Sequence, residues 1–197
     1  MSRTLENGSM EMSINKYKDV HNTDKFSLGY VNEIYDDLFV HIADSVGNVL
    51  EIGIQYGPSL KLWRDFFPNA QIYGVDIEKL VDFSNEERII TYYGDAYTKI
   101  FANSFEDEKF DIVIDDGPHT YESMVFFIQN YLSKVKPGGY LVVEDIVDCN
   151  WTPKLLEIID NELATNIIVY EMKGKQTTPE LLSRWSNGLD VIVIQRK

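Results

Sequence analysis

Asn48-Val-Leu-Glu-Ile-Gly-Ile-Gln-Tyr-Gly-Pro58 has the pattern of a buried strand, a tight turn and the start of a helix. The apolar run 48–54 is typical of a strand covered on both faces. Gly53 and Gly57 flank the turn, and glycine there lets a ligand approach the backbone closely. Pro58 suits the first turn of a helix over 58–67, where its missing N–H costs little. The same turn also fits an ordinary strand–helix connection, so other signals must decide between the two.

Strand and helix patterns alternate outward from this unit to the end of the chain. Further strands are expected at 70–76, 87–93, 110–115, 139–145, 166–171 and 189–195, and further helices at 29–43, 120–135 (ended by Pro137-Gly-Gly139) and 153–163. Such alternation predicts an α/β fold with helices on both faces of a mostly parallel sheet. The last two strands have no clear helix between them. We therefore expect a seven-stranded sheet with a terminal antiparallel strand.

Composition narrows the class of protein. A chain of 197 residues favours one domain, here 13–197, after a disordered or tag-like N-terminus at 1–12. The net charge of −14 disfavours binding to nucleic acid or to anionic membranes. The single cysteine, Cys149, excludes an intrachain disulfide, and 1–12 lacks the apolar core of a signal peptide. A cytoplasmic protein is the expectation.

Acidic residues end each of the first five expected strands. They are Glu51, Asp76, Asp95, Asp115 with Asp116, and Glu144 with Asp145. In an open α/β sheet, ligands bind beyond the carboxyl ends of the strands. An acid at the end of the second strand, such as Asp76, can accept hydrogen bonds from both ribose hydroxyls of a nucleoside. The pattern therefore predicts a nucleoside site beside a group of carboxylates.

At this point the chain resembles the Rossmann-like class I S-adenosylmethionine-dependent methyltransferases. The motifs that carry the resemblance are Glu51-Ile-Gly53 with Gly57, Gly74-Val-Asp76-Ile, Gly94-Asp-Ala96 and Lys136-Pro-Gly-Gly139. Within that class it is most similar to the macrolide and aminocoumarin sugar O-methyltransferases. The matching pieces are Asn22-Thr-Asp-Lys25, Val49-Leu-Glu-Ile-Gly-Ile54, Ser59-Leu-Lys-Leu-Trp63, Phe67-Pro-Asn-Ala70, Ile114-Asp-Asp-Gly-Pro-His119, Val143-Glu-Asp145 and Leu189-Asp-Val-Ile-Val-Ile194.

The resemblance implies a role for each matching residue. S-adenosylmethionine would lie under an N-terminal segment that contains Thr23, Asp24 and Lys25. Its expected contacts are Thr23, Lys25, Glu51, Gly53, Gly57, Ser59, Asp76, Asp95 and Asp115. A divalent cation, usually Mg²⁺, would be held by Asp116, Glu144 and Asp145, with His119 as general base. Family members typically have Ser in place of Pro118, and a His that is absent from 26–30.

The chemistry supports these roles independently. Mg²⁺ prefers hard oxygen ligands. Coordination lowers the pKa of a sugar hydroxyl, and an imidazole can accept its proton. Simpler interpretations stay open: His119 as a turn residue, Asp145 as a cap, and Tyr30 either in the core or over the cofactor.

The sequence thus predicts a methyltransferase that acts on a small hydroxylated acceptor, and it leaves open a homo-oligomer. One alternative is a nucleotide-dependent oxidoreductase. Against it, the turn from Gly53 to Gly57 lacks the Gly-x-Gly-x-x-Gly spacing that seats a pyrophosphate. The other alternative is a non-catalytic protein that binds S-adenosylmethionine.

Overall fold

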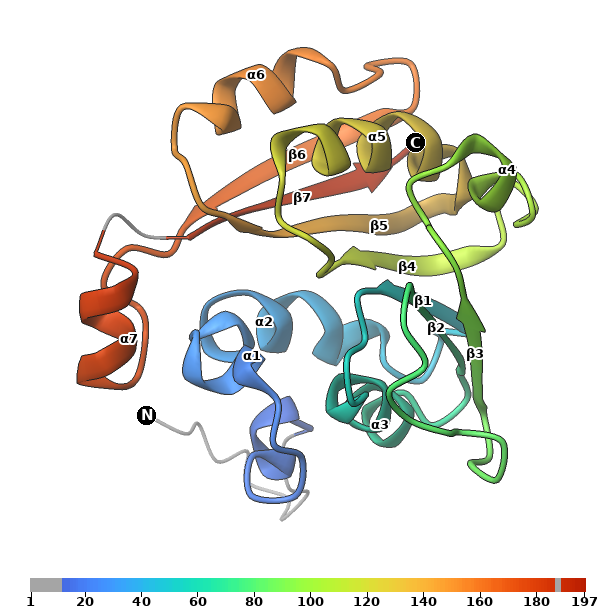
Figure 1. The fold of residues 1–197 in the computed structure, drawn as a ribbon, viewed down its shortest axis with the longest axis horizontal. Coiled ribbons are helices and arrows are strands. Elements are labelled where there is room, and N and C mark those ends of the chain that lie inside the picture. Colours follow the sequence, from blue (N-terminus) through green and yellow to red (C-terminus); the bar gives the residue numbers. More distant parts are fainter. Residues whose placement is uncertain (1–11, 187–188) are drawn as a thin grey trace.

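A seven-stranded sheet forms the centre of the protein in a computed structural model that describes residues 12–186 and 189–197 (Figure 1). The expected N-terminus at 1–12 lies almost wholly outside the described residues. The strands are β1 Asn48–Ile52, β2 Gln71–Asp76, β3 Ile89–Tyr93, β4 Phe110–Asp115, β5 Val135–Ile146, β6 Ala164–Glu171 and β7 Asp190–Arg196. The α-helices are α1 Asp24–Ser27, α2 Asp36–Phe39, α3 Pro58–Phe66, α4 Lys99–Ala102, α5 Tyr121–Tyr131, α6 Trp151–Glu157 and α7 Pro179–Arg184.

The strand order is β3-β2-β1-β4-β5-β7-β6. Neighbouring strands from β3 to β5 are parallel, whereas β7 is antiparallel to both β5 and β6. β1 lies in the middle of the sheet, and β2 and β3 follow on one side of it. The chain then crosses back, and β4 pairs with β1 on its other side. This reversal creates a switch point between β1 and β4, where α/β sheets bind ligands. The predicted α/β fold with a terminal antiparallel strand is confirmed.

Alternate residues of each central strand enter two separate cores. Val49 packs on one face of the sheet, while Leu50 packs on the other. The first core contains residues of α1, α2 and α3, and the second contains residues of α4, α5 and α6. Figure 1 shows these two groups of helices on opposite faces of the sheet. Burial on both faces explains why the strands read as continuous apolar runs.

The prediction of one continuous α-helix over 29–43 is wrong, although the segment is helical. The chain forms a π-helical turn at Val31–Tyr35, then α2, then a 3₁₀ turn at Val40–Ile42. In the π-helical turn, the backbone N–H of Asp36 donates to the carbonyl of Val31, five residues earlier. Such turns are rare and occur frequently at functional sites. Their cost here is offset by burial of Tyr30, Ile34 and Tyr35.

The helix expected over 120–135 ends earlier, at Tyr131, and is followed by a 3₁₀ turn at Leu132–Lys134. Val135 already pairs with Phe110, so β5 begins before Gly139, the start expected for it. A register irregularity between Phe110 and Ile112 absorbs the Pro137-Gly-Gly139 segment within the strand. The sequence pattern identified this segment as a helix stop, whereas it lies inside a β-bulged strand.

Asp111 joins three elements at the amino ends of the strands. Its carboxylate accepts the backbone N–H groups of Gly47 and Asn48 at 2.9 and 2.7 Å. The ammonium of Lys136 lies 2.9 Å from both of its oxygens. A side chain from β4 therefore fixes the start of β1 and the start of β5.

Replacing this carboxylate should measurably destabilise the fold. We expect Asp111→Ala to lower the free energy of unfolding by about 2 kcal/mol, because two backbone donors lose their partner. Asp107→Ala is the control: Asp107 also accepts from a lysine, Lys134, but is 66% exposed. Its loss should cost less than about 1 kcal/mol. Urea titration of both variants measures the difference, and equal losses would contradict the assignment.

Candidate functional site

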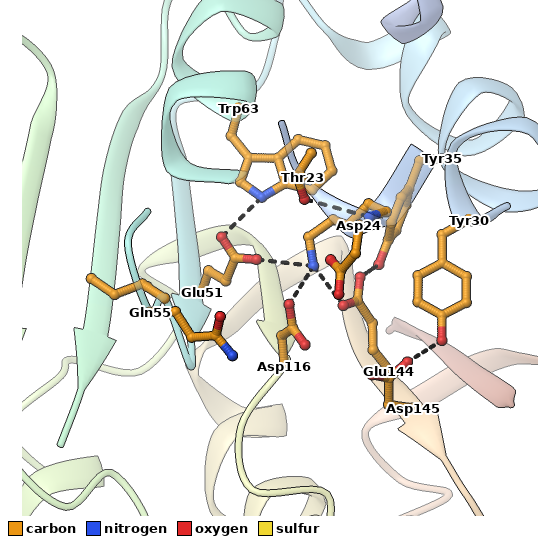
Figure 2. Close-up of polar contacts among 12 residues, drawn as sticks. Thr23, Asp24, Tyr30, Tyr35, Glu51, Gln55, Trp63, Asp116, Glu144 and Asp145 are labelled. Atoms are coloured by element: carbon orange, nitrogen blue, oxygen red, sulfur yellow. Dashed lines mark hydrogen bonds and ion pairs between the residues drawn. The ribbon is translucent and has the colours of Figure 1, made fainter. Parts of the chain in front are cut away.

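Three carboxylates from neighbouring strand ends surround the ammonium of Lys25 (Figure 2). Its Nζ lies 3.1 Å from Glu51 Oε1, 2.7 Å from Asp116 Oδ2 and 2.5 Å from Glu144 Oε2. Glu51 belongs to β1, Asp116 follows β4, and Glu144 belongs to β5. The lysine is 1% exposed, and both glutamates are as deeply buried. The carboxyl ends of three strands therefore meet at one buried cation.

Local contacts of the N-terminal segment place Lys25 in this position. Thr23 caps α1 by accepting the backbone N–H of Lys25. Two residues before Thr23, His21 Nε2 lies 2.8 Å from the carboxylate of Asp65 on α3. Upstream, the Tyr17 hydroxyl donates to the carbonyl of the same aspartate at 2.5 Å. The segment is thus fixed on α3 before it reaches the strand ends.

The electrostatics of this group are tightly coupled. Burial alone would lower the pKa of Lys25, but the charges of Asp116, Glu144 and Glu51 raise it well above its usual value. Burial raises the pKa of Glu51 and, more strongly, that of Glu144, against the opposing effect of Lys25. Three carboxyl groups thus share one ammonium, and a further cation beside them would favour their ionised forms against the effect of burial.

Neutral side chains from the core donate hydrogen bonds to Glu51, to Glu144 and to the neighbouring Asp145. The Tyr35 hydroxyl donates to Glu144 Oε1, and the Tyr30 hydroxyl donates to Asp145 Oδ1 (Figure 2). The indole N–H of Trp63 donates to Glu51 Oε2 at 3.2 Å. Of these donors, only Tyr30 was considered from the sequence, as a residue either of the core or over the cofactor.

Asp116, His119 and Asp145 form a second group beside Lys25. One ligand atom from each lies within 4.8 Å of the other two. His119 Nε2 is 3.8 Å from Asp116 Oδ1 and 3.6 Å from Asp145 Oδ2. The two carboxylate oxygens suit a hard divalent cation, and the imidazole nitrogen lies beside them. Glu144, the other expected ligand, has both oxygens engaged by Lys25 and Tyr35, so its role as a ligand stays a prediction.

Both His119 and Asp145 adopt the left-handed backbone conformation, with φ of 52° and 54°. Gln55, in the turn after β1, does the same with φ of 45°. Non-glycine residues in this region store backbone strain, and such residues cluster at active sites. The three lie around one cavity, which supports a functional reason for the strain.

The first of two adjoining cavities has a volume of about 330 Å³ and lies along the ends of β1, β2, β3 and β4. Its lining includes Gly53, Asp76, Asp95 and Asp116, as expected from the strand-end acids. Asp76 Oδ2 accepts the backbone N–H groups of Ile54 and Gln55, which shapes the turn after β1. A Cβ on Gly53 would lie 2.0 Å from the carbonyl oxygen of Asp116, so only glycine fits there.

The second cavity has a volume of about 220 Å³ and shares Gly53, Gln55 and Asp116 with the first. Its other lining residues include Thr23, Asp24, Ser59, His119 and Asp145. Asp116, His119 and Asp145 therefore all line the second cavity, and Asp116 also lines the first. Two molecules, one bound in each cavity, would come into contact beside Asp116.

Four expected contact residues line neither cavity. Gly57 is the cap of α3, with φ of 73°, and a Cβ there would overlap the ring of Phe83. Asp115 is buried and accepts the Tyr97 hydroxyl, and burial raises its pKa to about 7. Glu51 and Lys25 face each other. Direct contact of these four with a cofactor stays a prediction.

Comparison with known proteins agrees with the geometry. Residues 50–146 match the family model described as a methyltransferase domain. This part of the chain belongs to that methyltransferase family. It is 36% identical to demethylmacrocin O-methyltransferase of Streptomyces fradiae over 137 residues, which are 64% of this chain and 34% of that protein. It is 34% identical to mycinamicin VI 2''-O-methyltransferase of Micromonospora griseorubida over 156 residues, 73% of this chain and 38% of that protein.

Among solved structures, the methyltransferase MycE of the mycinamycin pathway, in complex with Mg, SAH and mycinamycin VI, has the same fold. The TM-score is 0.70 at 26% identity, over 96% of this chain and 54% of MycE. The class I methyltransferase fold and the resemblance to sugar O-methyltransferases are thereby confirmed. The chain spans little more than a third of the length of the two curated relatives. Among the described residues, no helix of this methyltransferase is long and apolar enough to cross a membrane.

Removing the Lys25 ammonium should destabilise the methyltransferase in a pH-dependent way. Lys25→Met leaves buried carboxylates without their cation, and we expect a loss of about 3–5 kcal/mol near pH 7 in chelator-treated protein. The pKa values of Glu51 and Glu144 are already raised by burial, and the variant raises them further. The folded variant then binds more protons than its unfolded chain, so its stability recovers as pH falls from neutral toward the ordinary pKa of glutamate, about 4.3.

Lys134→Met is the matched control for this measurement. Lys134 is 8% exposed, but its partner Asp107 is 66% exposed and can return to water. We expect a smaller loss, without recovery over the same pH range. Denaturant titrations across that range compare the two, and a pH-independent loss in Lys25→Met would refute the electrostatic account.

Proposed function

We propose that this protein is an S-adenosylmethionine-dependent O-methyltransferase that methylates a sugar hydroxyl of a glycosylated small molecule, assisted by a divalent cation. The observation that carries the proposal is the pair of cavities that meet at Asp116. The first suits a nucleoside and the second is lined by His119 and Asp145. The acceptor class rests on curated relatives that are named as O-methyltransferases. One of them, from Streptomyces olivaceus, is named 8-demethyl-8-alpha-L-rhamnosyl tetracenomycin-C 2'-O-methyltransferase, which specifies a rhamnosyl group.

The first cavity fits S-adenosylmethionine in shape and charge. Gly53 has no side chain to block its floor, and Asp76 and Asp95 offer acceptors for ribose and adenine. A bound donor would supply an electrophilic methyl group on a positively charged sulfur. The three carboxyl groups around Lys25 favour such a cation beside Asp116.

The donor set of the second cavity fits Mg²⁺ or a similar divalent cation. Asp116 Oδ1 and Asp145 Oδ2 would hold it, with Glu144 as a further ligand if Lys25 moves aside. A cation there would acidify and orient an acceptor hydroxyl. The protein would hold these carboxylate oxygens at the ends of β4 and β5 and leave the coordination positions toward the second cavity open to an acceptor.

His119 is the residue that would receive the acceptor proton. Its side chain is 31% exposed and lines the second cavity, so an acceptor hydroxyl can reach Nε2. Asp116 and Asp145 lie close enough to stabilise the imidazolium that results. Burial of Lys25 and the strained backbone at His119 hold the reacting groups in one arrangement, which supplies much of the rate through alignment.

The direct test is methyl transfer from radiolabelled S-adenosylmethionine. Mycinamicin VI and 8-demethyl-8-α-L-rhamnosyl-tetracenomycin C serve as acceptors, with and without EDTA. We expect a labelled, methylated glycoside with at least one acceptor, and loss of product in EDTA that Mg²⁺ restores. Thermal shift against S-adenosylhomocysteine and NAD separates the alternatives. Stabilisation by NAD alone would support an oxidoreductase, and cofactor binding without turnover a binding protein.

Asp116 should be needed for transfer but not for cofactor binding. We expect Asp116→Asn to lower kcat more than about 100-fold, since even an outer-shell partner of a metal costs 10-fold to 100-fold. Calorimetry should show S-adenosylhomocysteine bound within a few-fold of wild type. Asp82→Asn, at a carboxylate 63% exposed, is the control and should change neither quantity. Retained turnover in Asp116→Asn would remove the cation from the mechanism.

A further inference from the structure

Tyr30 and Tyr35 supply hydroxyls to the acids at the end of β5. Their residue numbers differ by five, which in a regular α-helix places two side chains on different faces. The π-helical turn at Val31–Tyr35 instead directs both rings toward the strand end (Figure 2). Their ring centroids are 6.5 Å apart, in an edge-to-face arrangement. The rare backbone therefore serves to aim two phenols at two adjacent acids.

Each phenol donates one hydrogen bond to an acid at the strand end, Tyr30 to Asp145 and Tyr35 to Glu144. The Tyr30 hydroxyl donates to Asp145 Oδ1. The other oxygen, Asp145 Oδ2, lies 3.6 Å from His119 Nε2. Asp145 and His119 both line the second cavity.

Packing alone does not explain the hydroxyl. Tyr30 is fully buried, and burying a phenol oxygen is unfavourable unless it is hydrogen-bonded. The aromatic cluster next to it includes Phe39, which stacks on Tyr35 without any polar atom. A phenylalanine would fill the position of Tyr30 equally well. The oxygen is accounted for by its contact with Asp145.

We propose that Tyr30 is a positioning residue for the cation site: its hydroxyl holds Asp145 Oδ1, so that Oδ2 is presented to a divalent cation beside Asp116. The inference rests on the proposed function, because it needs a cation at this place. Outer-shell donors of this kind fix the orientation of metal-binding carboxylates. Without the hydroxyl, Asp145 would be free to rotate, and the cation would lose a pre-oriented ligand.

Mn²⁺ binding tests this without any acceptor. Electron paramagnetic resonance gives the Kd of the metal alone for wild type and Tyr30→Phe, which keeps the buried ring. We expect Tyr30→Phe to bind Mn²⁺ about 10-fold to 100-fold more weakly. Tyr131→Phe is the matched control, since Tyr131 is as buried and donates to the carbonyl of Ala96 instead. It should lose comparable stability but keep the wild-type Kd for Mn²⁺.

The outcomes separate the inference from the function. Equal Kd values for wild type and Tyr30→Phe would overturn the positioning role while leaving the cation site intact. No Mn²⁺ binding by wild type would overturn the cation itself, and with it the metal part of the proposed function.

A second measurement uses the unaltered sequence, should Tyr30→Phe fail to fold. Protein labelled with ¹³C at the phenol carbon of tyrosine is titrated with Mg²⁺ and followed by NMR. We expect at least one buried tyrosine signal to shift with saturation at the Kd for Mg²⁺, because the hydrogen-bonded carboxylate becomes a ligand. Saturation by Mg²⁺ with no tyrosine signal displaced would overturn the proposal.

Discussion

The ammonium of Lys25 among Glu51, Asp116 and Glu144 is the interaction on which the site depends. Each of these acids would be costly to bury alone, and together they would repel one another. The lysine comes from a short N-terminal helix, whereas the acids come from three strands of the sheet. Satisfying the charges therefore requires that the N-terminal segment be docked over the strand ends, where it closes one side of the second cavity.

Much of the fold could be predicted because its signals are local. The buried strands appear as apolar runs, and the acids at their ends locate the site through the topology of a parallel sheet. α4 and α7 were missed because each is too short for a periodic pattern. The π-helical turn was missed because nothing in the periodicity of 29–43 separates it from an α-helix. It is linked instead to the contacts of Tyr30 and Tyr35 with acids 115 and 109 positions away.

The sequence predicted which residues come together at the site better than it predicted their contacts. Asp116, His119 and Asp145 were expected together, and they do converge. The partners of Lys25 were not, because they lie up to 119 residues away and no local pattern links them. The strained backbone at His119 and Asp145 was equally invisible, since left-handed residues other than glycine have no strong sequence signal.

The position of Lys25 also bears on the extent of the unit that folds together. The matched methyltransferase domain runs from residue 50 to residue 146. It includes Glu51, Asp116 and Glu144 but neither their cation nor β7, the strand that covers the edge of β5. Recombination between relatives at those family borders would separate charges that fold as one set. A chimera that keeps these acids next to their ammonium must inherit its leading segment and its sheet from the same parent.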